Sequence, residues 1–424
     1  MREMKDSGIE WIGQIPKDWD VVPHKRVMHK VKEICEQYNG EDIISLTMNG
    51  VIKRDLAAGG KMPTSFDGYQ YVKPNDLLLC LFDIDVTPRC VGVVKDYGVT
   101  SPAYSRFIMH DGYYNAYYDY LLRAIDDDKV FVHLSKNLRS SLTESDFGAI
   151  KTCVPSLAEQ ERIAAFLDAE CAEIDAALEK TRASIEEYKK LKQAVITQTV
   201  TKGIRGDRPM KNSGIEWIGE IPAGVPISRV GLHFDIVLGK MLCSAPVDDN
   251  YTLESYYCAA DVHFEGLSNG EKKKMWFSPD EKEQYCVKNG DLLVVEGGAG
   301  AGGCAIAVST DVPIYIQNSI MIVRSKGISN IRYLRYLLEC LVKKGYIDVV
   351  CNKATIPHFT KDKLANVPFI VFSQSEQEEI AEYLNEKCAG IDALIAKKQQ
   401  YLTEIENYKK SLIYEYVTGK KEVV

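Results

Sequence analysis

The clearest hydrophobic pattern lies downstream of Pro155, where more than forty residues pass without a glycine or a proline. Apolar side chains recur there at alternating steps of three and four, which is the spacing of a coiled-coil seam. Gly203 follows as a natural helix stop. The pattern therefore predicts one long helix over residues 158–203. Its expected seam residues are Ile163, Leu167, Cys171, Ile174, Leu178, Thr181, Ile185 and Tyr188, with Leu191 and Val195 beyond.

The same pattern returns near the end of the chain and predicts a second long helix within residues 375–424. The expected seam residues are Ile380, Leu384, Cys388, Ile391, Ile395, Lys398, Leu402, Ile405, Tyr408 and Leu412. A helix of about 44 residues would be roughly 66 Å long, at 1.5 Å per residue. A globular segment precedes each helix, so one chain can close by packing its two helices antiparallel. We therefore expect an antiparallel coiled coil that acts as a spacer.

Thr181 and Lys398 occupy equivalent polar positions near the middle of the two predicted seams. In an antiparallel pair they would lie close together, and a polar seam residue can fix the register of two helices at some cost in stability. The alternative is that the Lys398 side chain simply extends to solvent along its apolar stem.

The segments before the helices, residues 1–157 and 204–374, contain short apolar runs separated by turns, as mixed α/β domains do. In both segments a similar turn leads into a buried strand, at Val72–Leu78 and at Val287–Leu293. We therefore expect the same fold twice. The predicted class is α+β: two α/β domains joined by two long helices, with pseudo-two-fold symmetry.

Two short motifs are repeated almost unchanged, whereas the residues between them are almost unalike. Asp6–Pro16 returns as Asn212–Pro222, 206 positions later. Glu159–Ala164 returns as Glu376–Ala381, 217 positions later, so the two intervening segments differ in length by 11 residues. Constant motifs around unlike segments indicate a scaffold that presents two different recognition surfaces.

The doubled Trp-Ile-Gly-x-Ile-Pro and Glu-Gln-x-x-Ile-Ala motifs resemble those of the DNA-specificity subunit of Type I restriction-modification enzymes, over essentially the whole chain. The resemblance implies that each α/β domain is a target-recognition domain that reads half of a split sequence in double-stranded DNA. It also implies that the helices separate the two domains and hold two methyltransferase subunits, which restriction and translocase subunits join. The family's specificity subunit has no catalytic activity. Adenine methylation and its S-adenosylmethionine belong to the partner.

Composition and charge limit this interpretation without overturning it. No stretch approaches the roughly 18 apolar residues of a membrane span, and the N-terminus lacks the apolar core of a secretory signal, so we expect a cytoplasmic protein. None of the twelve cysteines forms a C-x-x-C pair, which favours reduced thiols over structural zinc. A net charge of −8 predicts modest non-specific affinity for DNA from this chain alone, and a basic partner could supply the missing attraction.

Side chains that match base edges identify candidate DNA contacts: Arg and Lys suit guanine, Asn and Gln suit adenine, and Ser and Thr suit several bases. In the first segment the candidates are Lys53, Arg54, Arg89, Ser101, Tyr104, Arg139 and Ser140. In the second segment they are Lys240, Gly298, Gln317, Asn318, Lys353, Thr355 and His358. Lys272–Lys274 is a candidate phosphate-contacting turn, or equally a solvated charge run. For each residue the alternative is an ordinary surface or structural role.

Two motifs suggest catalysis at first sight, and both are incomplete. Ser101–Tyr104 resembles the Pro-Pro-Tyr/Phe loop of amino-methyltransferases, but its third residue is alanine. Gly297–Gly303 lacks the Gly-Lys-Ser/Thr of a phosphate loop, which favours a flexible loop that lets the backbone approach DNA. The histidines are scattered, so no metal site is expected. The remaining alternative is a coiled-coil scaffold whose two α/β modules bind proteins.

Overall fold

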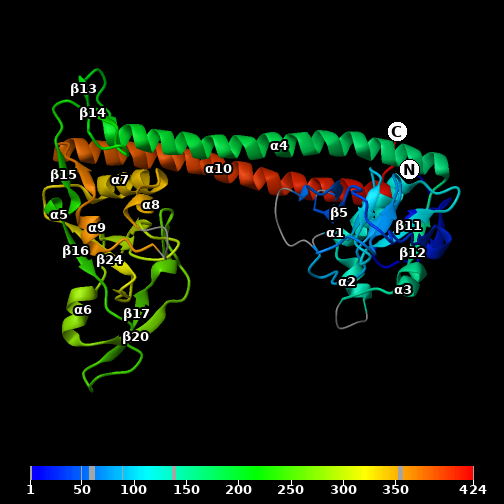
Figure 1. Ribbon diagram of the computed structural model, residues 1–424, viewed down its shortest axis with the longest axis horizontal. Helices are drawn as coiled ribbons and strands as arrows, with labels where there is room; N and C mark the ends of the chain where they lie inside the picture. Colours follow the sequence, from blue (N-terminus) through cyan, green and yellow to red (C-terminus); the bar gives the residue numbers. More distant parts are fainter. Residues whose placement is uncertain are drawn as a thin grey trace. The chain divides into compact units, whose positions relative to one another are not determined.

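The computed structural model divides the chain into two compact units, each of which takes part of both long helices (Figure 1). Unit 1 comprises Met1–Arg182 and Gln399–Val424, and unit 2 comprises Ala183–Lys398. The structure describes residues 2–48, 50–56, 63–87, 89–135, 140–351 and 357–423.

The α/β domain of unit 1 is built on an antiparallel four-stranded sheet with the order β4-β11-β8-β9, and helix α1 packs against β9. Its helices are α1 (Asn115–Asp127), α2 (Val130–Leu134) and α3 (Glu144–Ala149), with a 3-10 turn at His24–Arg26. Its strands are β1 (Met4–Asp6), β2 (Gln14–Pro16), β3 (Asp20–Pro23), β4 (Met28–Val31), β5 (Ile44–Thr47), β6 (Gly50–Lys53), β7 (Gln70–Val72), β8 (Leu77–Leu79), β9 (Val91–Val93), β10 (Gly98–Thr100), β11 (Ser105–Met109) and β12 (Lys151–Val154).

The α/β domain of unit 2 has the equivalent sheet, β16-β24-β21-β22, and helix α7 packs against β22. Its helices are α5 (Val230–His233), α6 (Pro279–Tyr285), α7 (Ile331–Lys343), α8 (Tyr346–Val350) and α9 (Lys361–Ala365), with a 3-10 turn at Ala259–Asp261. Its strands are β13 (Met210–Asn212), β14 (Glu220–Pro222), β15 (Ile227–Arg229), β16 (Phe234–Leu238), β17 (Thr252–Tyr257), β18 (Val262–His263), β19 (Gly266–Leu267), β20 (Lys273–Phe277), β21 (Leu292–Val295), β22 (Cys304–Ile306), β23 (Tyr315–Ile316), β24 (Ile320–Ser325) and β25 (Pro368–Ile370).

The two domains share one scaffold and differ in what is attached to it. The central strand β8 of unit 1 is completely buried, and so is β21 of unit 2, as the predicted turn-and-strand match requires. Beside this common sheet, unit 1 carries the hairpin β5-β6 and the pair β7-β10, whereas unit 2 carries the sheet β20-β17-β23. The predicted α+β class, with a repeated fold, is confirmed.

The repeated N-terminal motif folds into the same closed turn in both units. The Ser7 hydroxyl accepts a hydrogen bond from the N–H of Ile9 at 3.1 Å, and the backbone N–H of Ser7 donates to the carbonyl of Gly13 at 2.9 Å. Gly13 has a φ of +69°, and the equivalent Gly219 has a φ of +74°. This left-handed backbone is accessible to glycine at little cost, which explains why glycine occurs at this position in both copies.

The glutamate of the second repeated motif ties the N-terminal part of each unit to the start of a long helix. Glu159 accepts a hydrogen bond from the indole N–H of Trp19 at 3.0 Å and forms an ion pair with Arg2. In unit 2 the equivalent Glu376 pairs with Arg208 at 2.7 Å. A carboxylate in the first turn of a helix also interacts favourably with the helix dipole.

The long helices are α4 (Leu157–Lys202) and α10 (Gln374–Val417), and both begin within one residue of the predicted starts. Within each unit they run antiparallel, because an earlier residue of one pairs with a later residue of the other. In unit 1 Lys409 pairs with Asp175 at 2.6 Å, and in unit 2 Lys192 pairs with Asp392 at 2.7 Å. The two ion pairs are equivalent in the repeat. Their antiparallel arrangement is confirmed.

Most of the predicted seam is buried or half-buried, but two of its positions are wrong. Leu191 is 49% exposed and the equivalent Tyr408 is 53% exposed. The seam positions there are taken by the next residues, Lys192 and Lys409, because a regular heptad continues with a step of four. The prediction followed the apolar residue type instead of the spacing. Among the other predicted seam residues, Leu167, Ile174, Ile185 and Leu384 are buried, and Ile391 and Ile405 are half-buried.

The two polar seam residues have different surroundings, each within its own unit. In unit 1 the Thr181 hydroxyl donates to the carbonyl of Ala177, one turn earlier in the same helix, at 2.8 Å. In unit 2 the Lys398 ammonium lies 5.7 Å from the centre of the Tyr188 ring, which suits a cation–π contact. Their joint role in setting the register stays a prediction.

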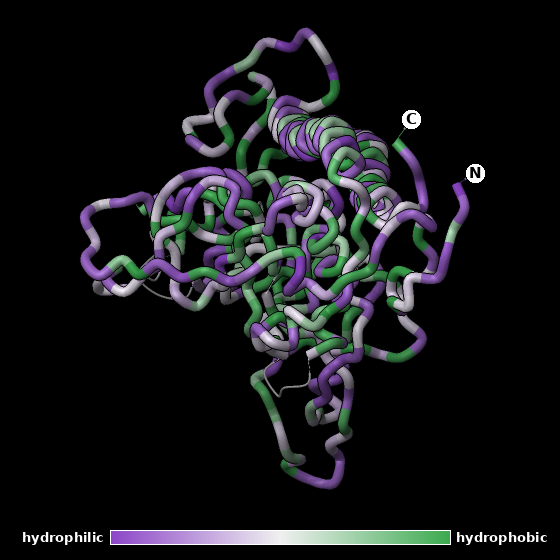
Figure 2. Tube along the Cα trace, turned by 90° about the vertical axis from the view of Figure 1, so that its right-hand side faces the viewer, coloured by the Kyte–Doolittle hydropathy of each residue, from purple (hydrophilic) through white to green (hydrophobic). Residues whose placement is uncertain are grey.

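The long helices are largely hydrophilic, with apolar residues at intervals (Figure 2). Within the described residues, no helix has an apolar stretch of the length that a membrane crossing needs. All twelve cysteines, which lie in the described part of the chain, are free thiols.

The corrected seam predicts unlike effects for two leucines of the same helix. Leu178 is buried in the main core of unit 1, so Leu178→Ala should lower the free energy of unfolding by about 2–4 kcal/mol. Leu191→Ala is the matched control and should change it by less than about 0.5 kcal/mol, because Leu191 is exposed. Urea denaturation followed by circular dichroism measures both. Equal losses for the two variants would contradict the corrected seam.

Candidate nucleic-acid interface

In unit 2 several predicted DNA contacts lie together where strand β16 ends. Lys240 pairs with Gln317 in an isolated β-bridge, and the N–H of Asn318 donates to the Lys240 carbonyl at 2.8 Å. Gly239 permits this approach: a Cβ atom there would lie 2.5 Å from the carbonyl oxygen of Gln317. A side chain at position 239 would therefore force the two segments apart.

The glycine-rich loop joins the same cluster through backbone hydrogen bonds. The N–H of Glu296 donates to the carbonyl of Ser319 at 2.8 Å, which links the loop to the segment that holds Gln317. On its other side, Gly297 forms an isolated β-bridge with His358, and the N–H of Gly298 donates to the Pro357 carbonyl at 3.2 Å. Five of the seven predicted contacts of this domain are thus brought to one place.

The glycines of this loop allow it to pack closely against the domain, in addition to the predicted close approach of its backbone to DNA. Gly302 has a φ of +82°, and a Cβ there would lie 2.8 Å from the Ile347 side chain of helix α8. The N–H of Gly302 also donates to the carbonyl of Val295 at 2.9 Å. The loop is therefore held against the domain, whereas the sequence favoured a flexible one.

Lys240 itself is a structural residue, which changes its predicted role. Its side chain is only 10% exposed, and its ammonium forms an ion pair with the carboxylate of Glu281. The same ammonium lies 4.8 Å from the ring centre of Tyr251 and 5.4 Å from that of Phe277. Because the charge is already neutralised and half-enclosed by aromatic rings, it is poorly placed to contact a base or phosphate.

The amides of Gln317 and Asn318 form a small network that can orient them for recognition. The Gln317 amide N–H donates to the side-chain oxygen of Asn318 at 2.6 Å, and its own oxygen accepts from the Ser319 hydroxyl at 2.5 Å. Both amides are half-buried. Such held amides suit bidentate hydrogen bonding to adenine.

In unit 1 the predicted contacts cluster around the β5-β6 hairpin. Arg89 braces the hairpin, because its guanidinium donates to the carbonyl of Val91 at 2.8 Å and to that of Met48 at 3.4 Å. Burial lowers the pKa of Arg89 below its usual value. At the other end of the hairpin, Lys53 pairs with Asp42 at 2.8 Å and with Asp96 at 3.5 Å. Arg54 follows directly, and its backbone N–H donates to the carbonyl of Ile43 at 2.8 Å, which extends the pairing of the hairpin by one residue.

The Ser101–Tyr104 turn is held from beneath by a buried glutamine. The amide of Gln70 donates to the carbonyl of Ser101 at 3.1 Å and to that of Tyr104 at 2.7 Å. The Tyr104 ring is half-buried against the small core beneath the hairpin, and burial raises the pKa of its hydroxyl. The turn is thus a rigid part of the surface, with the Ser101 hydroxyl at its start.

The remaining candidates are distributed as follows. Ser140 has a φ of +44°, and its carbonyl accepts a hydrogen bond from the N–H of Ile84 at 3.1 Å. Arg139, Lys353 and Thr355 lie outside the described residues.

The lysine run divides into a structural and a surface part. Lys272 pairs with Asp261 at 3.0 Å and lies 5.2 Å from the ring centre of Tyr257, so its charge is used inside the domain. Lys273 and Lys274 are exposed on the edge strand β20. Only the latter two are placed for phosphate contact.

Exposed apolar residues beside these clusters were not among the predicted DNA contacts. Met241 and Leu242 follow Lys240 directly and are 76% and 62% exposed. In unit 1, Met48 is 66% exposed in the segment that joins β5 to β6, and its carbonyl accepts a hydrogen bond from Arg89. Apolar side chains beside polar ones suit the major groove, where thymine presents a methyl group among hydrogen-bonding edges. Two adjacent apolar residues in a loop were the signal that could have identified them.

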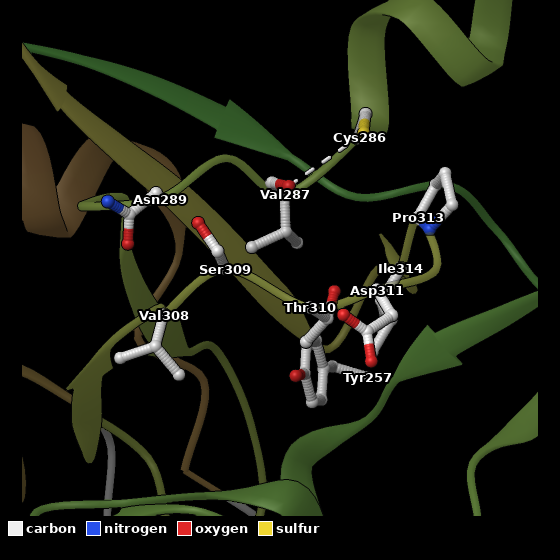
Figure 3. A pocket seen from close by; sticks show the side chains of 10 residues that line it. All are labelled: Tyr257, Cys286, Val287, Asn289, Val308, Ser309, Thr310, Asp311, Pro313 and Ile314. Atoms are coloured by element: carbon white, nitrogen blue, oxygen red, sulfur yellow. Dashed lines mark hydrogen bonds between the residues drawn. The ribbon is translucent and has the colours of Figure 1, made fainter.

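Elsewhere in unit 2, a small open hollow of about 270 Å³ lies between the Val308–Ile314 loop and the residues that precede β21 (Figure 3). Its polar lining comes from Asn289, Ser309, Thr310 and Asp311, and the Tyr257 ring borders it. The arrangement holds neither a nucleophile beside a base nor converging ligands. Among the described residues no cluster of three His, Cys, Asp or Glu side chains could hold a metal ion.

Comparison with known proteins agrees with this geometry. Residues 265–406 match the model of the Type I restriction modification DNA specificity domain. The specificity subunit of the Type I restriction enzyme MjaVIII from Methanocaldococcus jannaschii is 26% identical over 291 residues, covering 65% of this chain and 63% of that protein. Both matches are to the family that the repeated motifs resemble. The match to this curated relative thus spans less than two thirds of its length.

Two solved structures show that the fold extends over nearly the whole chain. A structure from work on complex assembly and conformational transition of the type I R-M system has a TM-score of 0.73 at 16% identity, covering 96% of this chain and 99% of that one. The HsdS subunit from Thermoanaerobacter tengcongensis has a TM-score of 0.55 at 16% identity, covering 96% and 98%. At these identities the likeness concerns the fold alone.

The structural role of Lys240 can be separated from a role in DNA binding. Lys240→Met should lower the free energy of unfolding by about 1–2 kcal/mol, because it leaves the half-buried Glu281 carboxylate without its cation. Lys273→Met, the control on the exposed strand edge, should change it by less than about 0.5 kcal/mol. Urea denaturation of the two variants gives both numbers. Unchanged stability of Lys240→Met would return this lysine to the candidate DNA contacts.

Proposed function

We propose that this chain is the DNA-specificity subunit of a Type I restriction-modification enzyme and that it reads a two-part, asymmetric sequence in double-stranded DNA. The observation that carries the proposal is the contrast between the two α/β domains. The sheets β4-β11-β8-β9 and β16-β24-β21-β22 are equivalent, yet unit 1 adds the β5-β6 hairpin and the β7-β10 pair where unit 2 adds the sheet β20-β17-β23. One scaffold with two unlike surfaces suits two unlike half-sites.

Reading of bases needs groups that hydrogen-bond to base edges and apolar groups that contact thymine methyls, and we propose that each domain offers both. In unit 2 these are the held amides of Gln317 and Asn318 next to the exposed Met241 and Leu242. In unit 1 they are the Ser101 turn and the hairpin braced by Arg89. Hydrogen bonds to base edges would combine with apolar contacts to thymine methyl groups. Lys53, Arg54, Lys273 and Lys274 would contact phosphates and position the protein without selecting sequence.

The paired long helices would serve as the spacer and as the platform for partner subunits. Two methyltransferase subunits would bind the constant helices, and restriction and translocase subunits would join that assembly. If both domains approach the same face of the duplex, the half-sites should lie about one helical turn apart, roughly 10–10.5 bp from centre to centre. We expect the complex to act in the cytoplasm, where free thiols such as these stay reduced.

Catalysis would belong to the partners, with S-adenosylmethionine bound by the methyltransferase subunits. The loop of this chain that resembles a methyltransferase motif supports that division. Ala103 replaces the second proline of the motif, and the half-buried Tyr104 ring packs against the domain's own small core.

The spacing requirement provides the test of this function. The chain, co-expressed with methyltransferase subunits, should select one two-part sequence from a random DNA pool. Inserting or deleting two base pairs in the unread gap should abolish specific binding, because it rotates one half-site by about 70° around the duplex. A gel shift with spacer variants measures this, and a duplex with scrambled half-sites is the control. Tolerance of either spacer change would contradict the fixed spacer, and selection of no sequence would favour a protein-binding scaffold.

A further inference from the structure

A tyrosine in the helix of each α/β domain binds the last turn of a long helix. In each unit this is not the long helix that directly follows the domain in the sequence but the other one. In unit 1 the Tyr117 hydroxyl donates to the carbonyl of Val417, the last residue of α10, at 2.8 Å. In unit 2 the Tyr333 hydroxyl donates to the carbonyl of Val200, in the last turn of α4, at 3.0 Å. Carbonyls in the last turn of a helix lack partners within the helix, so an external donor is needed when they are buried.

A buried glutamine binds the same domain helix to the start of the other long helix. The Gln160 side chain accepts from the N–H of Tyr114 at 2.8 Å, and the Gln377 side chain accepts from the N–H of Asn330 at the same distance. Both glutamines are completely buried. They are the constant glutamines of the repeated Glu-Gln-x-x-Ile-Ala motif, and this contact gives that motif a physical purpose.

A third bond completes the set one turn further along the domain helix. The Tyr120 hydroxyl donates to Asp168 of α4 at 2.7 Å. In unit 2 the Tyr336 hydroxyl donates to Asn385 of α10 at 2.8 Å. The acceptor changes from a carboxylate to an amide, but its position in the long helix is equivalent.

These three bonds form what we call the clamp of each unit. Its residues on the domain side are Tyr114, Tyr117 and Tyr120 in unit 1, and Asn330, Tyr333 and Tyr336 in unit 2. They recur every three residues, so they lie along one face of α1 or α7. All three positions match at a constant offset, although the surrounding recognition sequences are unlike.

The clamp can set the orientation of a whole domain. Helix α1 packs against β9, the edge strand of the sheet of unit 1, and α7 packs against β22 in the same way. The three bonds reach the start of one long helix and the end of the other, which fixes the rotation of α1 or α7 relative to both. A rotation of the sheet would therefore have to break these buried or part-buried hydrogen bonds, each of which contributes about 1 kcal/mol.

We propose that the clamp sets the angle at which each recognition domain meets the long helices, and so determines which base edges its side chains reach. Tyr117 and Tyr120 are then positioning residues for one half-site, and Tyr333 and Tyr336 for the other. None of them contacts DNA. The inference rests on the proposed function, since it assigns the clamp a role in sequence selection.

The experiment removes the clamp hydroxyls of one unit at a time, in the complex of the full chain with methyltransferase subunits. The variants are Tyr117→Phe with Tyr120→Phe, and Tyr333→Phe with Tyr336→Phe. Tyr118→Phe is the matched control: Tyr118 is buried on the same helix, and its hydroxyl has no hydrogen-bond partner among the described residues. Relative affinity is measured for duplexes that carry a single base change in one half-site or the other.

Each double variant should lose roughly tenfold of its discrimination in one half-site and keep full discrimination in the other, and the two variants should affect opposite halves. The control should change neither half. A purely structural role predicts lower thermal stability with discrimination unchanged in both halves, and that result would overturn the clamp proposal. If the unmodified complex selects no sequence at all, the proposed function fails instead, so the two failures are distinguishable.

Discussion

Each α/β domain is completed by two helix segments that lie far apart in the sequence. In unit 1 these are the first half of α4 and the last part of α10. In unit 2 they are the last part of α4 and the first part of α10. A single amphipathic helix of this length cannot bury its apolar seam alone, so the start of each helix depends on the end of the other. The Asp175–Lys409 and Lys192–Asp392 pairs and the buried tyrosine-to-carbonyl bonds all follow from that arrangement.

This dependence explains why the chain conserves its motifs internally while its domains diverge. The glutamate of the repeated motif contacts Trp19 in the N-terminal part of unit 1. The glutamine contacts the start of the domain helix and the residue after the preceding strand, so neither can change freely. The β5-β6 hairpin and the β20-β17-β23 sheet lie outside these contacts and can differ between the units. Specificity can therefore vary while the geometry that presents it stays constant.

The sequence predicted the parts of the fold that arise from spacing and repetition. The heptad spacing located both long helices, and the matched turns predicted the common sheet. Residue type gave the wrong prediction where it disagreed with the heptad spacing, because Leu191 and Tyr408 are exposed. Lys192 and Lys409 occupy the seam positions instead, since the aliphatic part of a lysine side chain can be buried while its ammonium pairs with an aspartate. For the candidate site, the sequence predicted which residues lie near one another but not which partners each side chain has. The aromatic surroundings and Glu281 partner of Lys240 come from segments up to 41 residues away, and no local pattern announces them.

We propose that a constant scaffold presents two independent recognition surfaces to DNA. The most direct test of this proposal replaces residues 226–374 with a second copy of residues 20–157, which keeps the repeated motifs and both long helices. The chimera, co-expressed with methyltransferase subunits, is then offered a random DNA pool. If each domain carries the specificity for one half-site, the chimera selects an inverted repeat of one half-site of the natural target, with an unread gap between the copies. Selection of the original asymmetric sequence would show that specificity lies outside the exchanged domain.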